Sequence, residues 1–394
     1  MAELKPGFQS YEERKKLYQD AFTWNKPERV LYNPNLYQWM YIDAGHTTEE
    51  CGYNYALVDQ IACEAVEKYN FDIMNVSGSP YRYCLAKYAA MGGGGVFRLN
   101  SAGEMNAVDA EYLGPDDYDR LKTDRLGVLW ENLIFKMYPN AKKLTPQEFA
   151  EASKTTREYL SAGAATKKKL RETYGTLVEE TTVAPQPFIE RLFSMYRGML
   201  GLSMDMRRQP EKVQEVCEYY DEKEMQMVHD RFDAFPYGPS NINYFDTKTA
   251  LMVHSIMNHK QMEKFFYPFL KKFLTYMQEH GKLAFLQCEA DCLRFADLLN
   301  EFPKGVINIV VEMDDPYEVR KQCPNVCISG GMSIDVMANG TKQECIDAAK
   351  KAIDELNCDG GLVLTTNKMV AYRNDMNAEN LKAVCDFVRD YKIN

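Results

Sequence analysis

The carboxyl-terminal half of this chain alternates between short apolar strands and amphipathic helices, and this alternation constrains the fold more than any other feature. Apolar runs lie at residues 283–286, 306–311, 326–329 and 362–365, and helical patterns near 260–280, 316–322 and 341–356 precede or separate them. Such a strand–helix–strand rhythm is typical of a parallel sheet covered by helices. A single α/β barrel with insertions fits a chain of 394 residues, so one main domain is expected.

The amino-terminal half is expected to hold a helical cap and a helical insertion. Residues 1–70, which include a predicted helix at about 48–69, are expected to pack as a cap on a barrel that spans 71–394. Residues 116–175 are charged and helical in pattern, and the run Thr145-Pro146-Gln147-Glu148 predicts the start of a helix. This insertion is expected to cover the barrel rather than to form it.

The charge balance and the cysteine content narrow the class of protein. The formal net charge is -10, so neither nucleic acid nor an anionic membrane is an expected partner. No apolar run approaches the roughly 18 residues that span a bilayer, and the amino terminus lacks an apolar signal core. Eleven cysteines in a long chain without framework spacing indicate reduced thiols. The sequence therefore predicts a soluble, cytoplasmic protein.

The run Leu286-Gln287-Cys288-Glu289-Ala290-Asp291-Cys292 places thiols and carboxylates directly after a strand. The carboxyl ends of barrel strands form the floor of the active site, so Glu289 is the leading candidate for an acid or a metal ligand. Glu312 follows the next strand and is a candidate companion. Either carboxylate could instead be a structural partner of Arg294 or Lys368.

Two further candidates lie near the same strand ends. His254 stands in the apolar segment Met252-Val253-His254-Ser255-Ile256 and is predicted to assist catalysis. Cys288 is a candidate metal ligand beside Glu289. Each has a structural alternative, because a lone histidine on an apolar face is often a core residue and a buried cysteine often acts as a small hydrophobe.

Several short motifs follow one another along the chain. They are Leu113-Gly114-Pro115-Asp116-Asp117-Tyr118, Ile328-Ser329-Gly330-Gly331, Asn339-Gly340-Thr341-Lys342-Gln343-Glu344, Gly360-Gly361-Leu362-Val363-Leu364 and Asn377-Ala378-Glu379-Asn380-Leu381. In order and spacing the chain resembles the uroporphyrinogen decarboxylase superfamily over most of residues 65–394. The resemblance implies a (β/α)8 TIM barrel, here with an amino-terminal helical cap and helical insertions.

The superfamily contains decarboxylases and corrinoid-linked methyltransferases, and the residues favour the second group. The Arg-rich amino-terminal segment of the decarboxylases has no counterpart here. Thiol-methylating members hold zinc with a His-x-Cys motif and a later Cys. The corresponding positions of this chain are Gln287-Cys288-Glu289 and Thr366-Asn367-Lys368-Met369. The run from Gly198 to Arg208 resembles the branch that demethylates methoxylated compounds in anaerobic one-carbon metabolism.

The resemblance implies an O-demethylating methyltransferase that moves a methyl group from a methoxylated small molecule, expected to be aromatic, to the cobalt of a partner corrinoid protein. No Asp-x-His-x-x-Gly motif for cobalamin binding occurs in the chain, so the corrinoid is expected on another protein. Glu289, with Glu312 and His254, would protonate the ether oxygen, or Glu289 and Cys288 would hold Zn2+ as a Lewis acid. The alternatives are methyl transfer from methylcobalamin to a thiol or a folate, a porphyrinogen decarboxylase-like enzyme, and a non-catalytic tetrapyrrole-binding barrel.

Substrate binding is expected from residues that follow strands. The candidates are Asn75, Ser77, Tyr81 and Arg82 after the first barrel strand, Phe188 and Tyr196 at a later strand-to-helix connection, and Asn367 after the last strand. The structural alternative is that the aromatic residues pack the cap against the barrel. The oligomeric state is left open, and a homodimer is one option.

Overall fold

A six-stranded parallel sheet forms the centre of the fold, as the strand–helix alternation predicts. The structure is a computed structural model that describes residues 3–74, 85–95, 97–109, 111–179, 183–234 and 244–393. The sheet order is β1-β10-β9-β8-β7-β6, and every neighbouring pair is parallel. The strands are β1 (Tyr32–Asn33), β6 (Thr247–Leu251), β7 (Ala284–Cys288), β8 (Ile307–Val310), β9 (Cys327–Met332) and β10 (Leu362–Thr366).

A second, two-stranded parallel sheet touches both edges of the first. It pairs β2 (Ile73–Met74) with β5 (Leu177–Val178). At one edge, the N–H of Asp72 donates to the carbonyl of Tyr32 over 3.1 Å and so links β2 to β1. At the other edge, Val183 forms a parallel bridge with Thr247 of β6. Backbone contacts therefore connect the two-stranded sheet, through the segments beside it, to β1 and to β6.

Helix α1 (Tyr11–Phe22) lies against the amino-terminal ends of the strands. A capping box begins the helix, with reciprocal hydrogen bonds between Ser10 and Glu13. Four of its residues, Tyr11, Leu17, Tyr18 and Phe22, belong to one apolar cluster. The other members come from or lie beside the strands: Leu31, Ile73, Leu177, Tyr244, Phe245, Cys327 and Val363, with Trp24, Leu283 and Phe285 at the margin. The Tyr18 hydroxyl also accepts a hydrogen bond of 3.0 Å from Asn308 of β8. The side chains that contact this cluster therefore mark the inward face of each strand.

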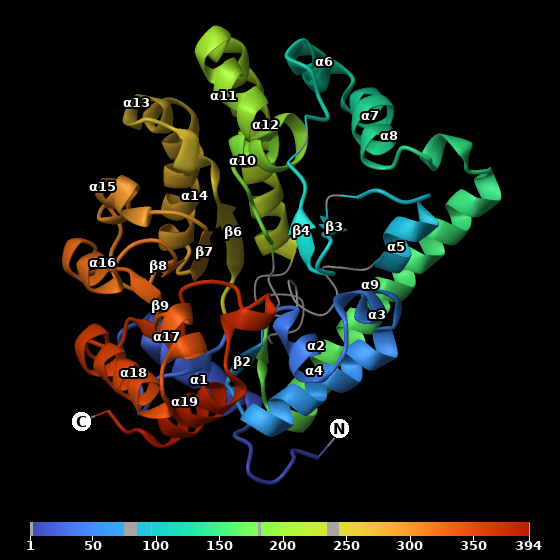
Figure 1. Cartoon of the computed structure of the whole chain (residues 1–394). Coiled ribbons are helices and arrows are strands. Elements are labelled where there is room, and N and C mark those ends of the chain that lie inside the picture. Colours follow the sequence, from blue (N-terminus) through green and yellow to red (C-terminus); the bar gives the residue numbers. More distant parts are fainter. Residues whose placement is uncertain are drawn as a thin grey trace.

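Helices cover the other face of the strands and complete a larger core. Figure 1 shows α14 (Tyr267–Glu279), α16 (Pro316–Gln322) and α18 (Lys342–Leu356) on the outer side of β7, β8 and β9. The remaining long helices are α4 (Tyr55–Tyr69), α9 (Pro146–Tyr174), α12 (Pro210–Ala234) and α19 (Ala378–Asp390). Leu, Ile, Val and Phe side chains from these helices and from the outward strand positions are buried together.

The amino-terminal half agrees in part with the sequence-based expectations. The predicted cap, residues 1–70, supplies α1 to the core and β1 to the sheet. The predicted helix at 48–69 is interrupted, because Asn54 ends α3 (Thr48–Tyr53) and its side chain accepts from Leu57 N–H to begin α4. Within the predicted insertion, α9 begins at the capping box of Thr145, as expected, and ends at Gly175 with φ of 62°.

A buried ion cluster joins α1, β1 and β2. Asp72 accepts from both terminal nitrogens of Arg29 over 2.8 and 2.7 Å, and Arg14 Nε lies 3.1 Å from the same carboxylate. Asp72 also accepts from the N–H of Tyr32 over 2.9 Å. Burial opposes ionisation of Asp72, but the two guanidinium groups and these hydrogen bonds prevail and lower its pKa. The cluster therefore holds a paired charge inside the fold.

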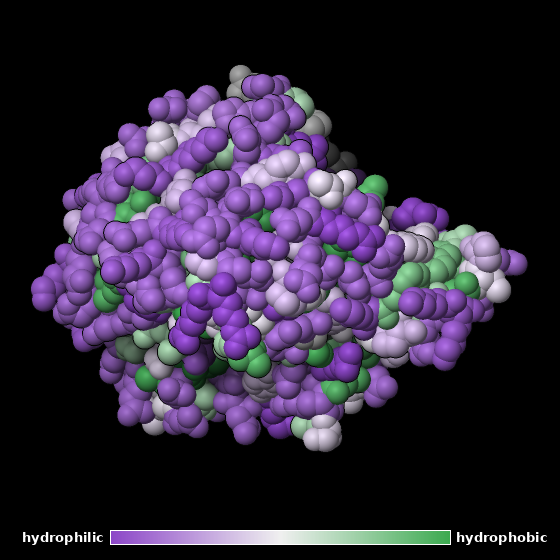
Figure 2. Space-filling view, turned by 90° about the horizontal axis from the view of Figure 1, so that it is seen from above, coloured by the Kyte–Doolittle hydropathy of each residue, from purple (hydrophilic) through white to green (hydrophobic). Residues whose placement is uncertain are grey.

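The surface is mainly polar. Figure 2 shows a face dominated by hydrophilic residues, with hydrophobic ones mostly scattered and one group at its right edge. Within the described residues, no helix combines the length and hydropathy that crossing a bilayer requires. The ten cysteines in the same part of the chain are free thiols, and Cys358 alone among these ten is exposed.

Candidate functional site

Two glutamates meet at the carboxyl ends of β7 and β8. Phe285 of β7 touches the cluster around α1, so alternation places Glu289 on the same inward face. Asn308 of β8 contacts α1 in the same way, and Glu312 follows it at an even spacing. The pairing of the two strands ends with Leu286 beside Ile309, and Glu289 and Glu312 each follow three residues later. The charge of Glu289 acts on Glu312, so the two carboxyl groups are neighbours. We call these two residues the acid pair.

The environment of the acid pair favours a bound proton. Burial, followed by the charge of Glu289, raises the pKa of Glu312 to about 7, whereas Lys368 opposes this rise. Lys368 is exposed and lies just past the end of β10. Two carboxylates on adjacent strand ends do not both ionise without a cost, and this repulsion adds to the effect of burial on Glu312. A carboxylic acid is thus available at this strand edge near neutral pH.

A third carboxyl, which the sequence reasoning did not identify, lies beside the acid pair. Glu190, on α10 (Phe188–Arg191), is fully buried and accepts from the backbone N–H of Met252 over 2.9 Å and of Val253 over 3.1 Å. Burial raises its pKa to about 8, the two amide donors oppose this, and Glu289 adds to the rise. An acidic residue in the apolar run Phe188-Ile189-Glu190 was the available signal, but only the long-range fold shows what it contacts.

His254 is a neutral, buried residue that lies beside Cys288, on the opposite face of β7 from Glu289. It lies on the short helix Val253–Ile256 after β6, is fully buried, and packs against the rings of Phe266 and Phe295. Burial lowers its pKa to about 4, with a smaller opposing effect from Asp291. Its Nε2 lies 3.6 Å from the sulfur of Cys288. At neutral pH the ring therefore offers one N–H and one lone pair, and no charge.

Arg294 was considered as a structural partner of Glu289, and the structure shows it bound to the segment after β6. The guanidinium donates to the carbonyl of His254 over 2.6 Å and to the carbonyl of Met257. Its ion pair is with Asp291, at 3.8 Å. Arg294 thus ties the β7 connection to the segment after β6.

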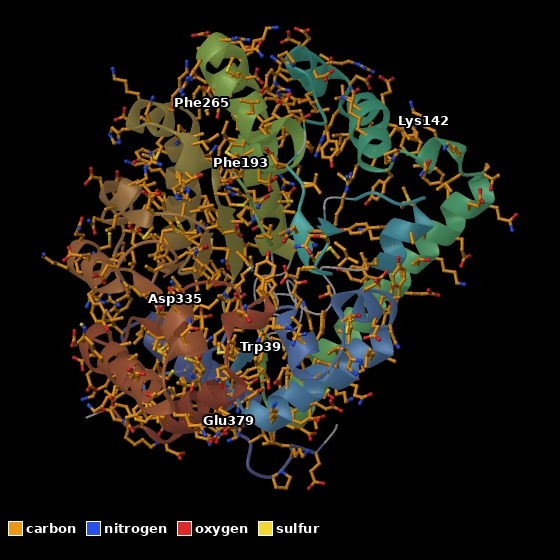
Figure 3. All side chains as sticks on the ribbon, in the orientation of Figure 1. Trp39, Lys142, Phe193, Phe265, Asp335 and Glu379 are labelled. Atoms are coloured by element: carbon orange, nitrogen blue, oxygen red, sulfur yellow. The ribbon has the colours of Figure 1, made fainter. Side chains whose placement is uncertain are left out.

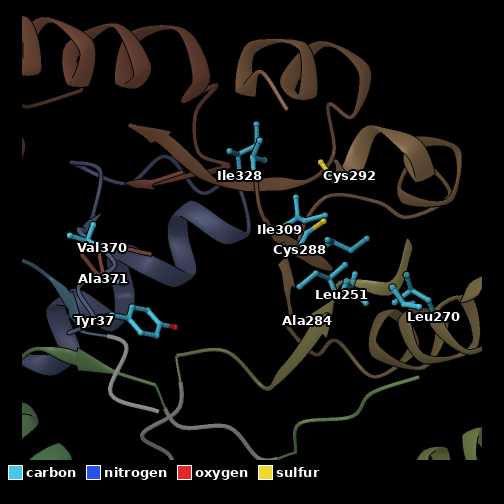
Figure 4. Close-up of a cluster of buried hydrophobic side chains, with 14 of the residues drawn as sticks. Tyr37, Leu251, Leu270, Ala284, Cys288, Cys292, Ile309, Ile328, Val370 and Ala371 are labelled. Atoms are coloured by element: carbon cyan, nitrogen blue, oxygen red, sulfur yellow. The ribbon is translucent and has the colours of Figure 1, made fainter. Parts of the chain in front are cut away.

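Cys288 lies on the opposite face of β7 from Glu289. Figure 4 shows it in the apolar cluster with Leu251 and Ile309, and its side chain is fully buried. Burial is the main cause that raises the pKa of the thiol, so it stays protonated. Among the described residues there is no group of three or more His, Cys, Asp or Glu side chains placed to hold a metal ion. The donor set seen here does not fit the zinc site that Glu289 and Cys288 were expected to form, and zinc binding stays a prediction.

The expected substrate-binding residues fall into two groups. Asn75, Ser77, Tyr81 and Arg82 lie outside the described residues. Phe188 and Tyr196 are both buried, and Phe188 stacks on Tyr220 of α12 with ring centroids 4.2 Å apart. Asn367 accepts the N–H of Ile334 over 2.9 Å and so fixes the connection after β9. The contacts of these three residues are therefore with other parts of the fold, and their role toward a substrate stays a prediction.

Two further segments lie close in the chain to candidate residues. Figure 3 labels Phe193, on the helical turn Leu192–Arg197 after α10, and Asp335, on α17 (Ile334–Asn339) after β9. The first segment follows α10, which carries Glu190, and the second follows the carboxyl end of β9.

The fold and the paired carboxyl groups define an α/β protein with an acid site at the carboxyl edge of its parallel sheet. No family model matches the chain, and no curated protein sequence matches it. Among solved structures, the chain is similar to a methyltransferase from Methanosarcina mazei, with a TM-score of 0.60 and 12% sequence identity. The match covers 96% of this chain and 98% of that chain. At this identity the likeness shows a shared fold, and it extends over nearly the whole of both molecules.

Proposed function

We propose that this protein is a methyltransferase of the uroporphyrinogen decarboxylase superfamily that moves a methyl group from a methoxylated aromatic compound to the cobalt of a partner corrinoid protein. The observation that carries the proposal is the acid pair, which places a proton donor where parallel strands end. The name of the Methanosarcina mazei neighbour supports the reaction class, and the motifs after β9 and β10 support the superfamily.

We propose further that the eight parallel strands close into a (β/α)8 barrel. The backbone contacts at Asp72 and at Val183 support this closure, because they join the two-stranded sheet to both edges of the larger one. The cluster around α1 supports it as well, since inward side chains from both sheets meet there. A barrel packed by α1 at its amino-terminal end leaves its carboxyl end for a substrate.

Cleavage of a methyl ether needs a nucleophile for carbon and a proton for oxygen. The reduced corrinoid of the partner supplies the nucleophile and, as the methyl acceptor, is a substrate of the reaction. Glu312 or Glu289 gives its proton to the ether oxygen while the O–CH3 bond breaks and leaves its electron pair on that oxygen. The products are a phenol, a methylated corrinoid and a carboxylate that regains its proton from water. General acid catalysis of this kind contributes about 10²–10⁴ in rate.

The other candidate groups lie at different distances from the acid pair. His254 contacts Cys288 on the far face of β7, so no step is assigned to it. Lys368 lies at the edge of the pair, where it limits the rise in the pKa of Glu312. No step is assigned to zinc, because the described donors do not assemble around one ion.

The proposal is tested with the purified protein, a reduced corrinoid partner protein or free cob(I)alamin, and a panel of methoxylated aromatic compounds. The methylated corrinoid is followed by its absorption spectrum, and bound zinc is measured in the same preparation. Transfer that is lost in Glu289→Ala and Glu312→Gln, and kept in the surface variant Glu318→Gln, would support the proposal. No transfer from any methoxylated donor, with methylcobalamin consumed by a thiol or a folate instead, would assign the protein to the alternative methyltransferase class.

A further inference from the structure

Glu190 connects helix α10 to a turn that lies more than 60 residues away in the chain. Its carboxylate accepts three hydrogen bonds, of 2.9, 3.1 and 3.1 Å, from the backbone amides of Met252 and Val253. These two residues form the turn between β6 and the short helix that carries His254. A carboxylate that binds consecutive amides fixes their orientation.

The residue directly before this turn binds the backbone of Glu289, one member of the acid pair. The N–H of Glu289 donates to the carbonyl of Leu251 over 3.0 Å, and Leu251 directly precedes the two amides that Glu190 binds. Leu251 also pairs with Cys288 in the sheet. Movement of this turn would therefore shift the backbone of Glu289 through Leu251. It would also shift the short helix that carries His254.

The role of Glu190 at the turn depends on its acceptor oxygens. The group is fully buried, and among the described residues it accepts from two backbone amides. A glutamine oxygen at this position could accept from the same amides, so this role needs an acceptor and not a charge. The titratable groups that interact electrostatically with Glu190 are Glu289 and Cys288, which lie at the carboxyl end of β7.

We propose that Glu190 is a positioning residue of the acid site, which holds the turn after β6 so that Glu289 keeps its place beside the reacting ether. This inference rests on the proposed function for its effect on catalysis. Its effect on the turn itself is independent of that function. Displacement of a catalytic group by about 1 Å can cost about 10²-fold in rate, so loss of Glu190 is expected to act mainly on kcat.

The test compares Glu190→Ala, Glu190→Gln and Glu190→Asp with the control Glu224→Ala. Glu224 is a suitable control because it also accepts a backbone amide, that of Gln186 over 3.1 Å, and it pairs with Arg191 away from the strand ends. Two readouts are used: methyl transfer kinetics, and hydrogen exchange of the amides of Met252 and Val253.

Glu190→Ala is expected to lower kcat by about 10–10²-fold with little change in KM, and to speed exchange of the two amides. Glu190→Gln, which keeps an acceptor oxygen, should retain kcat within about threefold and keep the amides protected. Glu190→Asp, shorter by one methylene, should fall between them and replaces the alanine variant if that variant does not fold. Unchanged exchange in both Glu190→Ala and Glu190→Asp would overturn the proposal, as would an equal fall in kcat in Glu224→Ala. If the wild-type protein transfers no methyl group, the proposed function fails, while the exchange readout still decides the role of Glu190.

Discussion

Replacement of Glu312 by glutamine removes a titrating proton from the acid pair and keeps the shape of the side chain. Burial and the charge of Glu289 raise the pKa of Glu312 from 4.5 to about 7. At pH 7 a carboxyl group with a pKa of about 7 is about half protonated, whereas one with a pKa of about 4.5 is protonated in about 0.3% of molecules. The folded site therefore holds about 150 times more of the acid form than an exposed glutamate would.

The wild-type pH profile follows from this difference. Because the acid must be protonated to act, kcat/KM should be level at low pH and fall about tenfold per pH unit above about pH 7. This descending limb reports loss of the proton from Glu312. In Glu312→Gln, kcat near pH 6.5 should fall by about 10²–10⁴-fold, and the limb near pH 7 should be absent because the remaining carboxyl has lost its like-charged neighbour.

The assay is the single-turnover rate of corrinoid methylation, measured from about pH 5 to about pH 9 over a range of methyl donor concentrations. This gives both kcat and kcat/KM, and product release does not mask the chemical step. Glu318→Gln is the matched control, since Glu318 lies at the surface and pairs with Lys321. The control should reproduce the wild-type profile. A Glu312→Gln profile that keeps both the wild-type rate and the limb near pH 7 would refute acid catalysis by the pair.

Three other predictions concern the fold, the thiol and the choice of substrate. Asp72→Asn leaves Arg14 and Arg29 without their buried carboxylate, and the free energy of unfolding in urea should fall by about 3–5 kcal/mol; a fall below about 1 kcal/mol would contradict the pairing. Because its folded pKa is below the ordinary value of 3.8, the contribution of Asp72 is present above that value and is lost as pH falls through the folded pKa. Cys288→Ala should change kcat by less than about threefold, since the thiol stays protonated on the far face of β7; simultaneous loss of activity and of bound zinc would show instead that the thiol is a ligand. Neutral methoxyphenols should show a lower KM than methoxybenzoates, because the acid pair repels a substrate carboxylate, and an equal or reversed order of KM values would contradict this.

Much of the local structure could be predicted from the sequence. The apolar runs that became β7, β8, β9 and β10 were predicted within a few residues, and so was the capping box at Thr145. These features depend on residues that are neighbours in the chain, through side-chain alternation, helical spacing and capping. The placement of Glu289 and Glu312 after successive strands was also visible, and parallel pairing then brought them together.

Other features depend on contacts between distant parts of the chain. The burial of Glu190 on the amides of Met252 and Val253, the position of α1 against the strand ends and the pairing of β1 with β10 were not predicted. The sequence also did not show that Glu289 and Cys288 would face opposite sides of β7. The end of the strand could not be predicted to within one residue.

The sequence by itself thus determined the order of strands and helices. It also indicated the reduced state of the thiols and the carboxylates available at the strand ends. Only the tertiary structure decided which of those carboxylates meet, which are buried and which therefore hold a proton near neutral pH. The physical reason is that periodicity is a local property, whereas desolvation and charge–charge interaction depend on every segment that packs around a group.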